Sequence, residues 1–80
     1  MATEILIIDD NPDIRNILND LISDEGYKTR VAANYNQALT EIDKKLPDVA
    51  IIDVKLDKGD NDGIELLSHI KKKNKDIPVI

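Results

Sequence analysis

Three aspartates follow two short apolar runs, and carboxylates in such positions can bind a metal ion or act as nucleophiles. Asp9 and Asp10 follow the run 5–8, and Asp53 follows the run 49–52. Both runs are too short to span a membrane and have the composition of strands buried on both faces. If these strands are parallel neighbours, the three carboxylates meet at one end of the sheet and repel one another unless a cation lies between them. Oxygen ligands of this kind favour Mg²⁺.

The first half of the chain predicts two strands and two helices. A strand over 3–9 leads to a helix that Asn11 caps, with Pro12 at its first position. Gly26 ends this helix, and residues 27–32 form a short, more polar strand typical of a sheet edge. Asn34 or Asn36 caps a second helix, which Pro47 ends. The expected inward apolar residues of the two helices are Ile14, Ile17, Leu18, Leu21, Ile22 and Tyr35, Ala38, Leu39, Ile42, Leu46.

The second half predicts a third strand over 49–53, a polar loop over 55–62 and a third helix over about 63–73. Ile64, Leu67 and Ile70 are expected to point inward from that helix. Residues 77–80 open a fourth strand. This βαβαβαβ order requires a parallel sheet with right-handed crossovers, and the two most apolar strands belong at its centre. We therefore predict an incomplete flavodoxin-like, doubly wound α/β sheet of order 2-1-3-4.

In this order the connections change direction between the first and third strands. Open α/β sheets bind ligands in the crevice outside the carboxyl ends of the strands at such a switch point. Asp9, Asp10 and Asp53 all map to that crevice. The topology and the acidic residues thus point to the same place in the fold.

The composition excludes several classes of protein. With 80 residues the chain forms at most one domain, and its net charge of −5 argues against nucleic-acid or anionic-membrane binding. No cysteine is present, so disulfides and cysteine-based zinc sites are excluded. A cysteine-free chain rich in Lys, Glu and Asp fits the cytoplasm. We find no signal peptide, and no apolar stretch approaches the roughly 20 residues that a membrane helix needs.

The run Ile5–Ile8 followed by Asp9-Asp10-Asn11, then Asp53, then Asp62-Gly63, resembles the receiver domain of two-component response regulators. The resemblance covers residues 1–80. The loop after Asp53 lacks a proline often seen there and is slightly longer than in common receivers, which is similar to NtrX-type receivers of larger transcription regulators. Since receivers continue beyond the fourth strand, the resemblance implies that 1–80 is the N-terminal portion of such a domain, without the switch Ser/Thr and Lys.

The resemblance also implies the roles of individual residues. Asp53 would be the phosphoacceptor for a histidine kinase, in a Mg²⁺-assisted self-phosphorylation and not as a turnover enzyme. Asp10 would bind Mg²⁺ directly and Asp9 partly through water. Asp53 and the backbone carbonyl of Lys55 would complete the protein ligands. Asn11 would help to position the loop or a water molecule.

Other interpretations remain open. The chain could be a non-phosphorylated pseudo-receiver or an α/β interaction module, and Mg²⁺ binding distinguishes these from a receiver. A phosphatase-like hydrolase would need a second acid two residues after Asp53, where Lys55 stands. His69 is expected at the surface or boundary, and the lysines of 71–75 at a solvated helix end. A partial sheet exposes an edge and apolar surface, so we also expect low stability or self-association.

Overall fold

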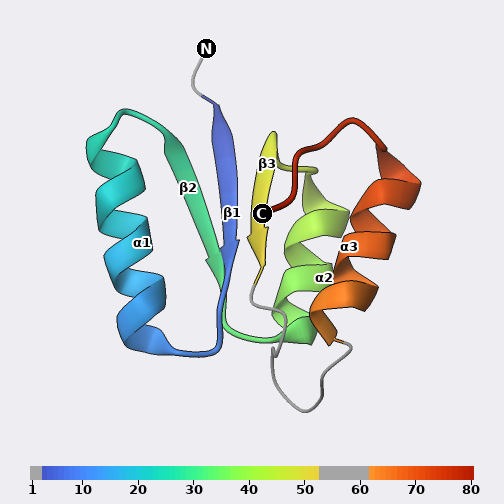
Figure 1. The fold of residues 1–80 in the computed structure, drawn as a ribbon, viewed down its shortest axis with the longest axis horizontal. Helices are drawn as coiled ribbons and strands as arrows, with labels where there is room; N and C mark the ends of the chain where they lie inside the picture. Colours follow the sequence, from blue (N-terminus) through green and yellow to red (C-terminus); the bar gives the residue numbers. More distant parts are fainter. Residues whose placement is uncertain (1–2, 53–61) are drawn as a thin grey trace.

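A parallel sheet lies between one helix on one face and two helices on the other. The computed structural model describes residues 3–52 and 62–80, and within them the sheet has three strands. Figure 1 shows α1 beside β2 and β1, with α2 and α3 side by side beyond β3. The elements are β1 (Glu4–Ile8), α1 (Pro12–Asp24), β2 (Lys28–Ala32), α2 (Tyr35–Lys44), β3 (Val49–Ile52) and α3 (Asp62–Lys73).

The strand order confirms the predicted topology. The sheet runs β2-β1-β3, and both pairings of β1 are parallel. A parallel bridge joins Ala50 to Val79, and the Ile52 N–H donates to the Ile80 carbonyl at 2.9 Å. The segment after α3 therefore lies next to β3, where the order 2-1-3-4 requires the fourth strand.

Local sequence signals define the helix ends. The Asn11 side chain accepts hydrogen bonds from the N–H groups of Asp13 and Ile14, and Pro12 occupies the first helical position. Gly26 has φ of 93°, a left-handed conformation that glycine adopts without steric cost. Asn34, and not Asn36, caps α2, because its side chain accepts from the Gln37 N–H.

The main core fills the space between the sheet and the pair α2 and α3. Alternate strand residues point to this face, and Tyr35, Leu39 and Leu46 pack against it as the α2 stripe predicts. The buried members of this core are Leu6, Ile8, Ala32, Ala38, Ile42, Ala50, Leu66, Ile70 and Ile77.

In the described part of the chain no helix is both long and apolar enough to cross a membrane.

The predicted inward face of α3 is wrong at two of its three positions. Ile64 and Leu67 are 52% and 36% exposed, whereas Leu66 and Ile70 are fully buried. Ile70 can belong to a stripe with either leucine, since residues three and four apart share one helix face. Packing against both α2 and β3 selects the rotation of α3 that buries Leu66.

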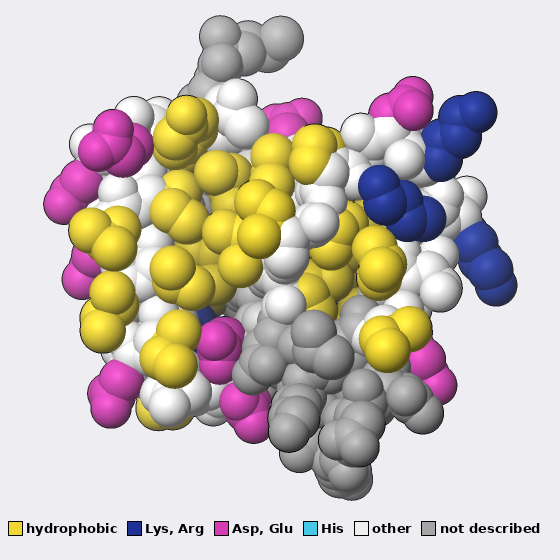
Figure 2. All heavy atoms as spheres, viewed as in Figure 1, with side chains coloured by type: hydrophobic (Ala, Val, Ile, Leu, Met, Phe, Trp, Pro, Cys, Tyr) yellow, Lys and Arg dark blue, Asp and Glu magenta, His cyan; other side chains and the backbone are white. Residues whose placement is uncertain are grey.

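The apolar stripe of α1 stays largely uncovered, which corrects its assignment to the core. This helix is described throughout and has no buried residue. Ile14, Ile17 and Leu21 are 46%, 57% and 60% exposed, while Leu18 and Ile22 are half-buried. Figure 2 shows hydrophobic side chains gathered over the sheet beside this helix. Parallel sheets are normally covered on both faces, and among the described elements α1 packs mainly on β2 and β1.

Candidate functional site

The carboxyl ends of β1 and β3 lie side by side. Ile8 pairs with Ile52 in the parallel register, and Asp9 is the first residue after β1. The Asp9 N–H donates to the Ala32 carbonyl at 3.1 Å, which ties the end of β1 to the end of β2. Asp53 and Lys55, which the sequence predicts as site residues, lie outside the described residues.

Three hydrogen bonds hold Asp9. Besides its N–H, its Oδ1 accepts from the Asn11 N–H at 2.9 Å, and its carbonyl accepts from the Arg15 Nη1 at 2.9 Å. The Arg15 bond is partly buried. One carboxylate oxygen of Asp9 is thus engaged by the loop that leads into α1. Asn11 positions this loop, as expected, through its backbone N–H and through its cap on α1.

The Asp10 carboxylate is exposed, and no group of residues 3–52 or 62–80 donates a hydrogen bond to it. Two adjacent carboxylates at a strand end provide the hard oxygen atoms that Mg²⁺ binds. The described residues alone contain no group of three or more acidic or histidine side chains suited to a metal. The donor chemistry of Asp9 and Asp10 therefore fits Mg²⁺ as part of a larger set of ligands.

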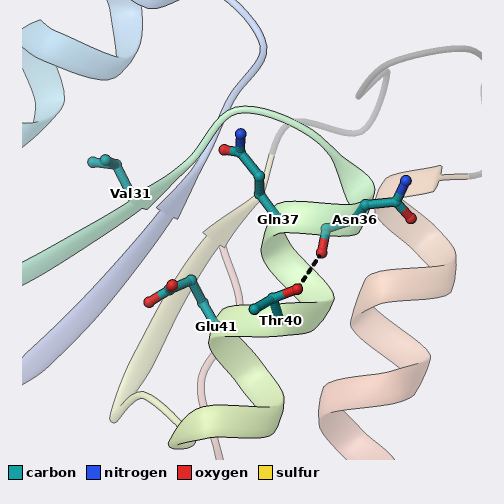
Figure 3. A pocket seen from close by; sticks show the side chains of 5 residues that line it. All are labelled: Val31, Asn36, Gln37, Thr40 and Glu41. Atoms are coloured by element: carbon teal, nitrogen blue, oxygen red, sulfur yellow. Dashed lines mark hydrogen bonds between the residues drawn. The ribbon is translucent and has the colours of Figure 1, made fainter.

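Two surface hollows lie away from this pair. The first, of about 270 Å³, is formed by β2 and the first turns of α2, and Figure 3 shows its side chains. Thr40 Oγ1 donates to the Asn36 carbonyl within the helix, and Gln37 Oε1 accepts from the Ala33 N–H. Both side chains thus bond to backbone groups of α2 and of the turn before it. The second hollow, of about 320 Å³, is lined by Tyr35, Ile64, Glu65, Ser68, His69 and Lys72.

His69 joins α3 to α2 through Asp43. Its Nε2 lies 3.4 Å from the Asp43 Oδ1, and the Lys73 Nζ lies 3.3 Å from the same oxygen. The hydrogen bond from His69, followed by that from Lys73, lowers the pKa of the Asp43 carboxyl below its ordinary value. His69 is half-buried, which confirms its expected place at the boundary.

A second ionic cluster, which sequence analysis did not identify, links β1, β2 and α2. Glu4 is only 8% exposed, and its Oε1 lies 2.8 Å from the Arg30 Nε. The Arg30 Nη1 also lies 3.1 Å from the Glu41 Oε1 and donates to the Glu41 carbonyl. Lys45 Nζ lies 3.7 Å from the other Glu4 oxygen. Arg30 is the register partner of Leu6, which lies two residues after Glu4 on the same strand. The contact between Glu4 and Arg30 therefore depends on strand register, and the spacing of the two residues along the chain does not predict it.

Known proteins of one family match this chain along nearly its whole length. The family model described as the response regulator receiver domain matches residues 5–80. The nitrogen assimilation regulatory protein NtrX of Azorhizobium caulinodans is 40% identical over the whole chain, which spans 18% of that protein. The sporulation initiation phosphotransferase F of Bacillus subtilis is 42% identical, and the chain spans 63% of it.

Solved structures agree in sequence and in fold. NtrX from Brucella abortus is 39% identical with a TM-score of 0.88, over 99% of this chain and 18% of that one. The response regulator TrrA from Thermotoga maritima, solved in complex with Mg²⁺ and BeF, is 32% identical with a TM-score of 0.85, over 96% of this chain and 65% of that one. The sequence and the doubly wound sheet thus agree, and the chain belongs to the response regulator receiver domain family of two-component systems.

Proposed function

We propose that this chain is the N-terminal portion of a receiver domain that accepts a phosphoryl group on Asp53 from the phosphohistidine of a histidine kinase. One observation carries the proposal. Ile8 and Ile52 pair at the point where the strand order reverses, and Asp9-Asp10 and Asp53 are the next residues along the chain. The topology thus supports a site at which both acidic segments leave adjacent strands together.

The reaction follows from the chemistry of a carboxylate nucleophile. A carboxylate oxygen of Asp53 attacks the phosphorus in line, and a new O–P bond forms as the N–P bond of the phosphohistidine breaks. The imidazole nitrogen keeps the electron pair of the broken bond. Asp53 then carries an acyl phosphate. Catalysis consists mainly of positioning and charge neutralisation, because the transition state is loose and spreads charge over the equatorial oxygens.

Asp9, Asp10, Asp53 and the Lys55 carbonyl would hold Mg²⁺. When bound, this ion supplies positive charge that offsets the repulsion between the carboxylates and the incoming phosphoryl group. Asp10, which is exposed, would be the direct ligand, whereas Asp9, already bonded to Asn11, would act partly through water. The related TrrA was solved in complex with Mg²⁺ and BeF, which supports the choice of Mg²⁺ as the ion.

The proposed biological setting comes from the relatives. NtrX of Azorhizobium caulinodans is a regulatory protein, and all 80 residues of this chain align with 18% of it. We therefore place the domain in a cytoplasmic regulator of transcription. The 80-residue chain itself would not contact DNA, since its net charge of −5 opposes binding to a polyanion. Nucleic-acid binding belongs to an output domain.

A second candidate function is protein interaction without phosphorylation. The observation that favours it is the exposed apolar stripe of α1, in which Ile17 and Leu21 are more than half exposed. Exposed apolar patches mark interaction surfaces, so this face would support self-association of the 80-residue chain. Such a module has no need of Mg²⁺, which makes metal binding the distinguishing property.

Labelling with a small phosphodonor tests the main proposal. The protein, incubated with radiolabelled acetyl phosphate and Mg²⁺, should acquire label that base and hydroxylamine remove, as expected of an acyl phosphate. Asp53→Asn should abolish the label. Asp24→Asn, which changes an exposed acid of α1, is the matched control and should keep it. Label on Asp53→Asn at the wild-type level, or an unlabelled wild-type protein, would contradict the proposal.

A further inference from the structure

Arg15 reaches back from α1 to the acidic end of β1. Its Nη1 donates to the Asp9 carbonyl at 2.9 Å in a partly buried bond, while its own N–H donates to the Asn11 carbonyl at 3.0 Å. Arg15 is half-buried, so its guanidinium is held against the loop and is not freely solvated. Hydrogen bonds from a charged donor are shorter and stronger than neutral ones.

The bonded carbonyl belongs to the peptide unit that joins Asp9 to Asp10. Peptide units are planar, so holding the carbonyl oxygen fixes the orientation of the whole unit. The Asp9 N–H and Oδ1 are already bonded to Ala32 and Asn11. Among the described residues, the bond from Arg15 is the third anchor of Asp9, and it lies directly before Asp10. It therefore sets the direction in which the Asp10 backbone and carboxylate leave the strand.

We propose that Arg15 is a positioning residue for the Mg²⁺ site, acting through the Asp9 carbonyl on the orientation of Asp10. This inference rests on the proposed function, because it needs Asp10 to be a metal ligand. Groups that orient metal ligands through hydrogen bonds typically contribute about 10–100-fold to metal affinity. Arg15 does so from the second turn of α1, which the sheet and the Asn11 cap hold in place.

Whether replacing Arg15 weakens or tightens Mg²⁺ binding distinguishes a positioning role from a purely electrostatic one. A permanent positive charge close to a cation site repels Mg²⁺, so removing the charge alone would tighten binding. Loss of the anchor would instead let the Asp9–Asp10 peptide unit rotate and would weaken binding. Positioning dominates in this proposal, because the guanidinium donates to the carbonyl oxygen at 2.9 Å in a partly buried bond.

The test is Mg²⁺ titration of the 80-residue chain, followed through the amide signals of residues 9–11. Arg15→Ala should weaken Mg²⁺ binding about tenfold, the lower end of the range for residues that orient metal ligands. Arg15→Lys should recover part of the affinity, because an ammonium group can still donate to the Asp9 carbonyl. Lys72→Ala removes one exposed charge from α3 and is the control, with binding within about twofold of wild type.

Urea unfolding with and without Mg²⁺ excludes a merely structural role. Such a role would lower the stability of Arg15→Ala in metal-free buffer and leave the stabilisation by Mg²⁺ unchanged. Positioning predicts that the increment due to Mg²⁺ shrinks, and Arg15→Gln provides the same comparison if the alanine variant does not fold. Unchanged or tighter Mg²⁺ binding by the Arg15 variants would overturn this inference alone. A folded wild-type protein that does not respond to Mg²⁺ would overturn the proposed function as well.

Discussion

Ile8 of β1 and Ile52 of β3 are register partners, each the last residue of its strand. The chain continues from them into Asp9 and Asp53. The pairing of these two apolar residues thus brings the ends of β1 and β3 to the same level of the sheet. The proposed site would depend on the register of this parallel pair, because a slip of one residue would turn every side chain of the strand to the other face.

Mg²⁺ should bind this end of the sheet weakly, because the ion keeps several of its waters and is seldom enclosed by protein ligands alone. Titration should shift the amide signals of residues 9–11 and 53–57. Asp10→Ala should remove most of the response, while Asp76→Ala, which changes an exposed acid after α3, should retain it. An amide spectrum of the folded protein that is unchanged at millimolar Mg²⁺ would contradict this prediction.

Removing Arg30 should lower the free energy of unfolding much more than removing an exposed charged residue. Arg30→Ala leaves the buried Glu4 carboxylate without its closest cation, and breaking such a pair costs about 3 kcal/mol. Urea unfolding would measure this loss. Lys44→Ala is the control, since that side chain is 68% exposed in its pair with Glu41 and its removal should cost less than about 0.5 kcal/mol. Equal effects of the two substitutions would show that burial of Glu4 does not matter.

The contact between α2 and α3 should depend on pH in the acidic range. His69 and Lys73 hold the pKa of the Asp43 carboxyl below its ordinary value of 3.8. A lowered pKa means that the folded state favours the charged carboxylate. The stabilisation of the folded state by the Asp43 carboxylate is therefore complete above the pKa that this carboxyl has in the unfolded chain. It is lost as the pH falls through the lower pKa of the folded state.

Carboxyl NMR titration of wild type and His69→Ala would test this relationship. Loss of the histidine should raise the Asp43 pKa toward 3.8, because its hydrogen bond is the largest cause of the shift. Lys73→Ala should raise it less. A titration of Asp43 that is the same in His69→Ala and in wild type would contradict the assignment.

The uncovered face of α1 should drive self-association. Ile17→Glu should shift the chain toward monomer, and its stability should change by less than about 0.5 kcal/mol, since the Ile17 side chain is 57% exposed. Asn16→Glu adds the same charge on an exposed polar position of the helix and should leave association unchanged. Sedimentation would compare the three proteins, and a wild-type chain that stays monomeric at high concentration would refute the prediction.

Features that depend on local chemistry and on hydrophobic pattern could be predicted from the amino-acid order. Asn11 and Pro12 specify the start of α1 because one supplies a side-chain acceptor and the other lacks an N–H. Gly26 specifies its end through a left-handed conformation. The two apolar runs specified the central strands and hence the order β2-β1-β3, since parallel sheets bury their most apolar strands at the centre. The same apolar run that predicts β1 also places Asp9 and Asp10 directly after the end of that strand.

Which side chains contact one another across the fold could not be predicted in this way. The rotation of α3, which buries Leu66 in place of Leu67, depends on two packing partners that no helical period can identify. The bond from Arg15 to the Asp9 carbonyl and the pair between Arg30 and Glu4 join residues that strand register and helix placement bring together. The exposure of the α1 stripe has the same origin, because an apolar face is buried only when another element packs on it. Such contacts are properties of the assembled layers and have no local signal in the chain.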